Sequence, residues 1–137
     1  MRKDAREVVF KILYSELFVD FNDELFSELS AEFKLNDNEI SYAKDLLSDI
    51  AAHKGELDGI LERYAVNYNL DRIYPTDKCA LYIGLAEMTY RADVPNIVAI
   101  DEAMALCKKY STKDSTSFVN GIFAKYKTDL ENSRKLQ

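Results

Sequence analysis

The sequence is poor in the residues that turn a chain. It has four glycines and two prolines among 137 residues, and no tryptophan. An all-β protein needs frequent tight turns, and glycine and proline supply many of them. A core can still form, because 47% of the residues are apolar. The scarcity of turn residues therefore favours an all-α domain.

Long apolar runs are also missing. No apolar stretch approaches the roughly 18 residues that a transmembrane helix needs. The first residues, Met1 to Asp4, are not followed by the apolar block of a secretion signal. We therefore expect a cytoplasmic protein without a membrane span.

Cysteine and histidine are too few to suggest a metal site or a catalytic centre. Cys79 and Cys107 have no cysteine or histidine cluster beside them, and we expect both as free thiols in the core. His53 is the only histidine, and no nucleophile or second base accompanies it in sequence. The sequence thus predicts no catalytic residue, no metal and no cofactor.

The charge of the chain is acidic overall but uneven along its length. The formal net charge is −6, which by itself argues against nucleic acid as a ligand. Residues 20–62 hold twelve acidic and three basic residues, whereas residues 1–19 and 63–137 are each slightly basic. Because an anion responds to the local potential, a basic site outside residues 20–62 stays compatible with RNA.

Three apolar helical patterns follow one another in the second half of the chain. Their spacing and start signals predict helices over residues 75–91, 93–110 and about 114–126. Gly84 lies inside the first helix, where alanine is better by about 1 kcal/mol, and so predicts a second helix crossing at close range. Glu87 in the same helix must be paired if it is buried.

The first half of the chain predicts four more helices. They span about residues 3–19, 21–33, 36–55 and 56–68. In the first of these helices we expect Leu17 and Phe18 to continue the apolar face that begins at Val8 or Val9. The predicted fold class is therefore all-α, with about seven helices.

Several short segments carry a resemblance to a known family. They are Leu81-Tyr82-Ile83-Gly84-Leu85-Ala86-Glu87-Met88, Asp93-Val94-Pro95, Ala99-Ile100-Asp101-Glu102-Ala103 and Phe118-Val119-Asn120-Gly121-Ile122. In this order and spacing they resemble the successive signatures of the NusB family of bacterial transcription antitermination factors. Ala5-Arg6-Glu7 with Leu13-Tyr14-Ser15 is similar to the family's opening helix, so the likeness covers nearly the whole chain.

The resemblance implies a fold and a function. The fold is a single NusB-like domain over residues 1–137, with helical subdomains of about residues 1–54 and 55–137. The function is to pair with the ribosomal protein NusE, to bind the boxA element of nascent ribosomal RNA transcripts as single-stranded RNA, and to help RNA polymerase read through terminators. No covalent chemistry is involved. Two alternatives stay open: a helical adaptor that binds protein and no RNA, and a homodimer.

Basic residues at the start of the chain are the first candidates for RNA contacts. They are Arg2, Lys3, Arg6 and Lys11. The resemblance implies a contact with RNA for the first three, because they match an arginine-rich segment of NusB proteins. By charge alone, the same residues also fit an ordinary solvated helix start.

The start of the last helix is the second candidate region. Lys113 stands before helix N–H groups that attract phosphate. The resemblance implies that Asp114, Ser117, Phe118 and Asn120 lie at or beside the RNA-contacting region. Phe118 fits either a core position or a platform for base stacking.

The resemblance also implies a protein-binding surface on the C-terminal helices, with Tyr82, Glu87, Tyr90 and Arg91 as candidates. A NusB-like domain precedes the catalytic domain of some ribosomal RNA cytosine methyltransferases, which raises an enzyme as a further hypothesis. We set that hypothesis aside, because the chain has no glycine-rich nucleotide loop and no predicted strands.

Overall fold

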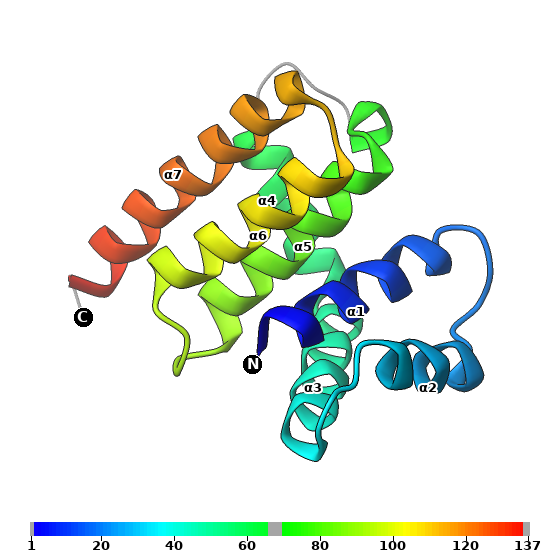
Figure 1. The fold of residues 1–137 in the computed structure, drawn as a ribbon. Coiled ribbons are helices and arrows are strands. Elements are labelled where there is room, and N and C mark those ends of the chain that lie inside the picture. Colours follow the sequence, from blue (N-terminus) through cyan, green and yellow to red (C-terminus); the bar gives the residue numbers. More distant parts are fainter. Residues whose placement is uncertain (1, 66–69, 136–137) are drawn as a thin grey trace.

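The chain forms helices and no strand over residues 2–65 and 70–135, which are the residues that the computed structural model describes. Figure 1 shows their arrangement. The helices are α1 (Arg2–Glu16), α2 (Asp23–Glu32), α3 (Asp37–Ala52), α4 (Lys54–Tyr64), the 3₁₀ helix η1 (Leu70–Arg72), α5 (Pro75–Tyr90), α6 (Asn96–Tyr110) and α7 (Lys113–Lys135). The predicted all-α class with about seven helices is confirmed.

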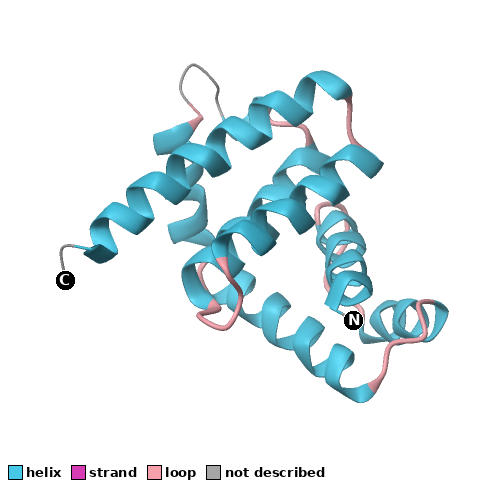
Figure 2. Cartoon of the chain, turned by 60° about the vertical axis from the view of Figure 1, so that its left-hand side comes forward, coloured by secondary structure: helices cyan, strands magenta, loops and turns pink. Residues whose placement is uncertain are grey.

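Helix α5 lies at the centre of the molecule. It contacts α1, α3, α4, α6 and α7, so that its residues from Cys79 to Met88 are all buried. A helix that is apolar on every side has to be surrounded in this way. Figure 2 shows the described part of the chain as helices joined by loops.

Side chains of asparagine start two of the helices. Asn22 accepts hydrogen bonds from the backbone N–H groups of Glu24 and Leu25, at 2.8 and 3.3 Å, and caps α2. Asn36 and Glu39 form a reciprocal capping box at the start of α3. Such caps satisfy N–H groups that have no partner inside the helix, and they set where each helix begins.

The ends of several helices differ from the sequence predictions. Helix α1 ends at Glu16, and the predicted inward positions of Leu17 and Phe18 are wrong, because these side chains are 41% and 67% exposed. Helix α7 continues to Lys135, beyond the predicted end near residue 126. Helix α4 ends at Tyr64, and part of its predicted extension lies outside the described residues.

Side chains of α6 and α7 pack directly against Gly84 of α5. A Cβ built on Gly84 would overlap the ring of Phe123 and stand 3.1 Å from Cβ of Ala103. The close crossing predicted from a glycine inside this helix is therefore confirmed, with Phe123 from α7 occupying the space that a side chain would need.

The buried apolar residues of all seven α-helices form one cluster. Helix α1 packs against α2 and α3, and also against α5 and α6. The division into subdomains near residue 54 stays a prediction. Within the two described ranges, no helix is both long and apolar enough to span a membrane.

We predict that Gly84→Ala destabilises the fold although alanine favours helices. Phe123 is fully buried, so the added methyl group forces the packed core to move, at a cost of about 1–3 kcal/mol in the free energy of unfolding. Gly121→Ala is the matched control, because Gly121 is exposed on α7 with open space around it, and should stabilise by about 1 kcal/mol. Urea unfolding measures both. Equal stabilisation of the two variants contradicts the tight crossing.

Candidate nucleic-acid interface

The C-terminal end of α6 lies beside the first turns of α5 and α7, and Tyr14 near the end of α1 lines a hollow next to them. Buried Asp77 in the first turn of α5 accepts hydrogen bonds from the hydroxyl of Ser111 and, at 3.7 Å, from the thiol of Cys107. Thr76 donates to Ser111 at 3.2 Å. This network fixes the turn between α6 and α7 against the start of α5.

Helix α1 is fixed to α6 by a second buried carboxylate. Glu7 accepts hydrogen bonds from Lys109, at 2.6 Å, and from the hydroxyl of Tyr110. Burial raises the pKa of Glu7, but the hydrogen bonds from Lys109 and Tyr110 outweigh it and hold the pKa below its ordinary value. Glu7 therefore stays ionised and keeps both partners in place.

Tyr110 presents an aromatic ring between two lysines. It stacks on Phe10 with ring centroids 4.7 Å apart, and the ammonium groups of Lys11 and Lys109 each lie 5.5 Å from its centroid. Lys3 lies beside Lys109 on the α1–α6 surface. We call the set Lys3, Lys11, Lys109 and Lys113 the cationic strip. The first three lie on α1 and α6, and Lys113 is the first residue of α7.

The first turn of α7 begins one residue before the sequence predicts. Thr112 caps it by accepting a hydrogen bond from the N–H of Ser115 at 3.2 Å. The predicted residues Lys113, Asp114, Ser117 and Asn120 are all exposed on this part of α7. Asp114 adds a negative charge beside the helix start, where it opposes an incoming phosphate.

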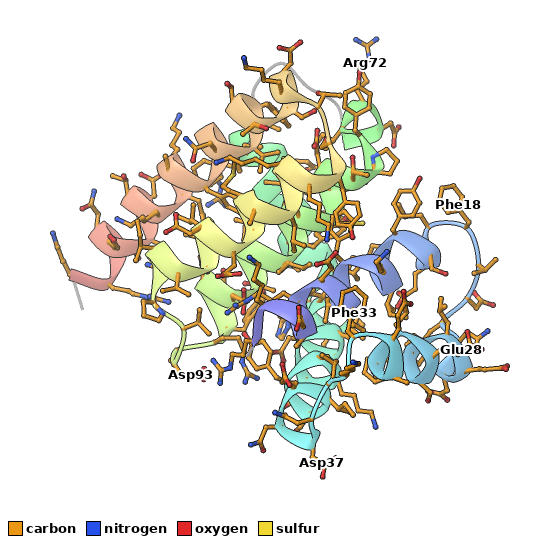
Figure 3. The ribbon with its side chains drawn as sticks, in the orientation of Figure 1. Phe18, Glu28, Phe33, Asp37, Arg72 and Asp93 are labelled. Atoms are coloured by element: carbon orange, nitrogen blue, oxygen red, sulfur yellow. The ribbon has the colours of Figure 1, made fainter. Side chains whose placement is uncertain are left out.

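Phe118 combines the two roles that its sequence position left open. It is half-buried and packs against the core cluster. It also lines a hollow of about 360 Å³, together with Arg72, Tyr74, Asp77, Thr112 and Asp114. We call this hollow the Phe118 hollow. Figure 3 shows Arg72 at the outer edge of the molecule.

A second hollow of about 360 Å³ joins α1 to this region. Three tyrosines line it, namely Tyr14, Tyr74 and Tyr110, with Thr76, Ser111 and Thr112. We call it the tyrosine hollow. Because Lys11 lies over the Tyr110 ring, the hollow connects the cations of α1 to the start of α7.

Arg6 does not belong to this surface, and its predicted contact with RNA is not compatible with its position. Its residue is 4% exposed, and its Nε donates to both carboxylate oxygens of Glu87, at 2.8 and 2.9 Å. Tyr42 donates to the same carboxylate. Burial raises the pKa of Glu87, and the Arg6 guanidinium opposes that rise. The pairing that the sequence required for a buried Glu87 is confirmed.

Arg2 is exposed but points towards another part of the surface. It donates to Asp93 at 2.8 Å and lies 4.2 Å from the centroid of the Tyr42 ring. Arg91 lies 4.9 Å from the same centroid. Arg2 is therefore separate from the tyrosine hollow, although Lys3 next to it lies on the strip.

Two of the four residues predicted to contact a protein partner are buried. Tyr82 is 4% exposed and donates to Asp58 at 2.5 Å, and Glu87 is fully buried. These positions are not compatible with direct contact to a partner. Tyr90, which stacks on His53 with centroids 3.9 Å apart, and Arg91 are half-buried.

An exposed apolar segment, which the sequence pattern did not predict, follows α1. Leu17, Phe18, Val19 and Phe21 are each more than 40% exposed, and we call them the apolar patch. Figure 3 shows Phe18 projecting away from the end of α1. Tyr14 links the patch to the tyrosine hollow, because its ring contacts that of Phe18 at 5.4 Å between centroids. The sequence does contain one sign of this exposed segment. Because Asn22 caps the next helix, residues 17–21 belong to the connection in which the chain changes direction.

Both thiols lie in the interior. Cys79 and Cys107 are buried free cysteines, as predicted. Burial raises the pKa of Cys107 to about 11, with the nearby Asp77 carboxylate adding to the effect, so it is a poor nucleophile. Among the described residues, no group of three or more histidine, cysteine, aspartate or glutamate side chains is placed to hold a metal ion.

Comparison with known proteins gives a consistent result. The sequence pattern of the NusB family matches residues 3–128. A transcription antitermination protein NusB from Acetivibrio thermocellus is 34% identical over 125 residues, which cover 90% of this chain and 86% of the relative.

Solved structures are similar over the whole fold. The NusB structure of T. maritima has a TM-score of 0.83 at 28% identity and covers 91% of this chain and 89% of its own. A structure described as the antitermination factors NusB and NusE in complex with dsRNA contains a chain with a TM-score of 0.79 at 30% identity. That match covers 90% of this chain and 92% of the other.

We predict that Arg6→Ala destabilises the protein because it leaves Glu87 buried without its cation. The expected loss in the free energy of unfolding is about 3–5 kcal/mol, measured by urea denaturation. The triple variant R6M/Y42F/E87L, which replaces the whole polar group by apolar side chains, is the control and should lose less than Arg6→Ala alone. A larger loss in the triple variant contradicts this explanation.

Proposed function

The chain belongs to the NusB family of transcription antitermination proteins, and we propose that it binds single-stranded boxA-type RNA together with a ribosomal protein partner of the NusE type. Its relatives are named as transcription factors rather than enzymes. The observation that carries the RNA proposal is the continuity of the cationic strip with two hollows lined by aromatic side chains. Lysines attract the phosphates of a single strand, and aromatic rings stack on its unpaired bases.

Preorganisation supports the proposal. Glu7 holds Lys109 and Tyr110, and Tyr110 is stacked on Phe10, so neither group has to be ordered when RNA arrives. A site that is already ordered loses less conformational entropy on binding. The cation positions also lie outside the acidic segment of residues 20–62, which limits repulsion of the phosphates.

The apolar patch supports a protein partner. Four neighbouring exposed apolar side chains cost solvation free energy unless another molecule covers them, and such patches commonly mark interaction sites. A partner seated on the patch would stand next to the tyrosine hollow, because Tyr14 touches both. We propose that the NusE-type partner docks there and that the two proteins present one RNA-binding surface.

The wider assembly is also part of the proposal. By resemblance, the RNA is the leader of nascent ribosomal transcripts, and the pair acts in a complex with RNA polymerase in the cytoplasm. Homodimerisation stays a prediction. The competing function is a helical adaptor that binds its protein partner and no RNA.

We predict that K3A/K11A/K113A weakens RNA binding and reduces its salt dependence. Each lost phosphate contact lowers the slope of log K against log salt by about 0.7 for a single strand, so the slope should fall by up to about 2. Fluorescence anisotropy with a labelled boxA-type RNA, with and without NusE, measures it over a range of salt concentrations.

K44A/K54A/K125A is the matched control, since it removes the same charge from exposed lysines outside the strip. It should leave the slope nearly unchanged. Equal effects of the two triple variants would overturn the assignment of the strip. Partner binding without any RNA binding by the wild type would favour the adaptor.

We predict that Phe18→Ala weakens the NusE-type partner without destabilising the chain. An aromatic anchor that becomes buried on binding contributes about 2 kcal/mol or more, which is about 30-fold in affinity. Phe18 is 67% exposed, so the free energy of unfolding should change by about 0.5 kcal/mol or less. Isothermal titration calorimetry with NusE tests this. Ile97→Ala, which removes an apolar side chain that is 58% exposed on α6, is the control and should bind like the wild type.

A further inference from the structure

Tyr74 is the aromatic residue common to both hollows. It lines the tyrosine hollow with Tyr14 and Tyr110, and it lines the Phe118 hollow with Phe118 and Arg72. Neither the sequence signatures nor the comparisons assign it a role. Its side chain therefore borders two hollows of similar volume.

The structure gives the Tyr74 ring no internal role. The residue is 61% exposed, although it directly precedes α5. Its backbone carbonyl accepts a hydrogen bond from the N–H of Lys78 at 2.9 Å, whereas its side chain has no hydrogen-bond or ring contact among the described residues. A ring that neither packs nor pairs is available to a ligand.

We infer that Tyr74 is a wedge that separates two consecutive bases of a bound RNA strand, one base entering the tyrosine hollow and the next the Phe118 hollow. This inference rests on the proposed function. Each hollow has about 360 Å³, near the lower end of the range of about 300–1,000 Å³ for small-ligand sites, which suits one base rather than a folded element.

The walls of the hollows carry the groups that bases use. In the tyrosine hollow, rings supply stacking surfaces, and the hydroxyl oxygen of Thr76, which donates to Ser111, can still accept from a base amino group. In the Phe118 hollow, Arg72 can donate to a base edge and Asp114 can accept from an amino group. Unpaired bases are recognised by this combination of stacking and hydrogen bonding to their edges.

Each hollow has a cation beside it. Lys11 lies over the ring of Tyr110, which lines the tyrosine hollow, and Arg72 lines the Phe118 hollow. The phosphates before and after the two separated bases would therefore meet positive charge. A peptide ligand has no such regular backbone charge, so the arrangement favours a nucleic-acid strand.

The experiment uses a series of boxA-type single-stranded RNAs. Each RNA carries 2-aminopurine at two adjacent positions, and the pair shifts by one nucleotide from one RNA to the next. Two stacked 2-aminopurines give an exciton-coupled circular dichroism signal that disappears when they are separated. Binding of the wild-type protein should abolish this signal at one step of the strand and leave it at the others. Tyr74→Ala should retain the signal at that step and weaken binding about 5- to 150-fold.

Two variants control the measurement. Tyr74→Phe keeps the ring and should behave as the wild type. A role of the hydroxyl alone predicts instead that Tyr74→Phe weakens RNA binding as Tyr74→Ala does. Ile97→Ala removes another exposed apolar side chain, 58% exposed and outside both hollows, and should leave RNA binding unchanged. Thermal unfolding of Tyr74→Ala should match the wild type, because the ring is exposed.

The outcomes separate this inference from the function on which it rests. If the wild type binds RNA, K3A/K11A/K113A weakens it, and Tyr74→Ala neither weakens binding nor alters the signal, the wedge is overturned while RNA binding stands. If the wild type binds no RNA with or without NusE, the proposed function itself is overturned, and the wedge with it.

Discussion

An ion pair shielded from water, between Arg6 and Glu87, fixes helix α1 against the central helix α5. A buried carboxylate is too costly without a cation and hydrogen bonds, so this contact is satisfied in one relative position of the two helices. Tyr42 donates to the same carboxylate and brings α3 into the same arrangement. The position of α1 in turn decides which of its cations face the start of α7.

Two further buried carboxylates extend this constraint to the proposed RNA-binding surface. Glu7 holds Lys109 and Tyr110 of α6, and Asp77 holds Ser111 in the turn before α7. Glu7 therefore ties α1 to α6, and Asp77 ties the start of α5 to the turn between α6 and α7. Acids inside the protein thus position the basic and aromatic groups on its surface.

Acidic and basic residues are concentrated in different parts of this chain. Residues 20–62, which form α2, α3 and most of α4, hold twelve acidic and three basic residues and make the chain acidic overall, whereas the cationic strip lies on α1, α6 and α7. A phosphate responds to the local potential of the surface that it approaches rather than to the net charge of the whole chain. An acidic protein can in this way carry a surface that suits a polyanion, together with an apolar patch that suits a protein.

The sequence by itself determined the all-α class, most helix starts, the family, the close crossing at Gly84 and the need of Glu87 for a partner. These features follow from spacing, capping residues and the cost of particular side chains, all of which act over one or two helical turns. Only the tertiary structure decided which cations reach solvent and which apolar residues stay outside. Arg6 and Lys3 look alike in sequence, but Arg6 meets a carboxylate 81 positions away and is buried by it. Leu17 and Phe18 fit the periodicity of α1, yet they fall beyond its end, where no second helix covers them, because burial depends on contacts between distant segments rather than on local pattern.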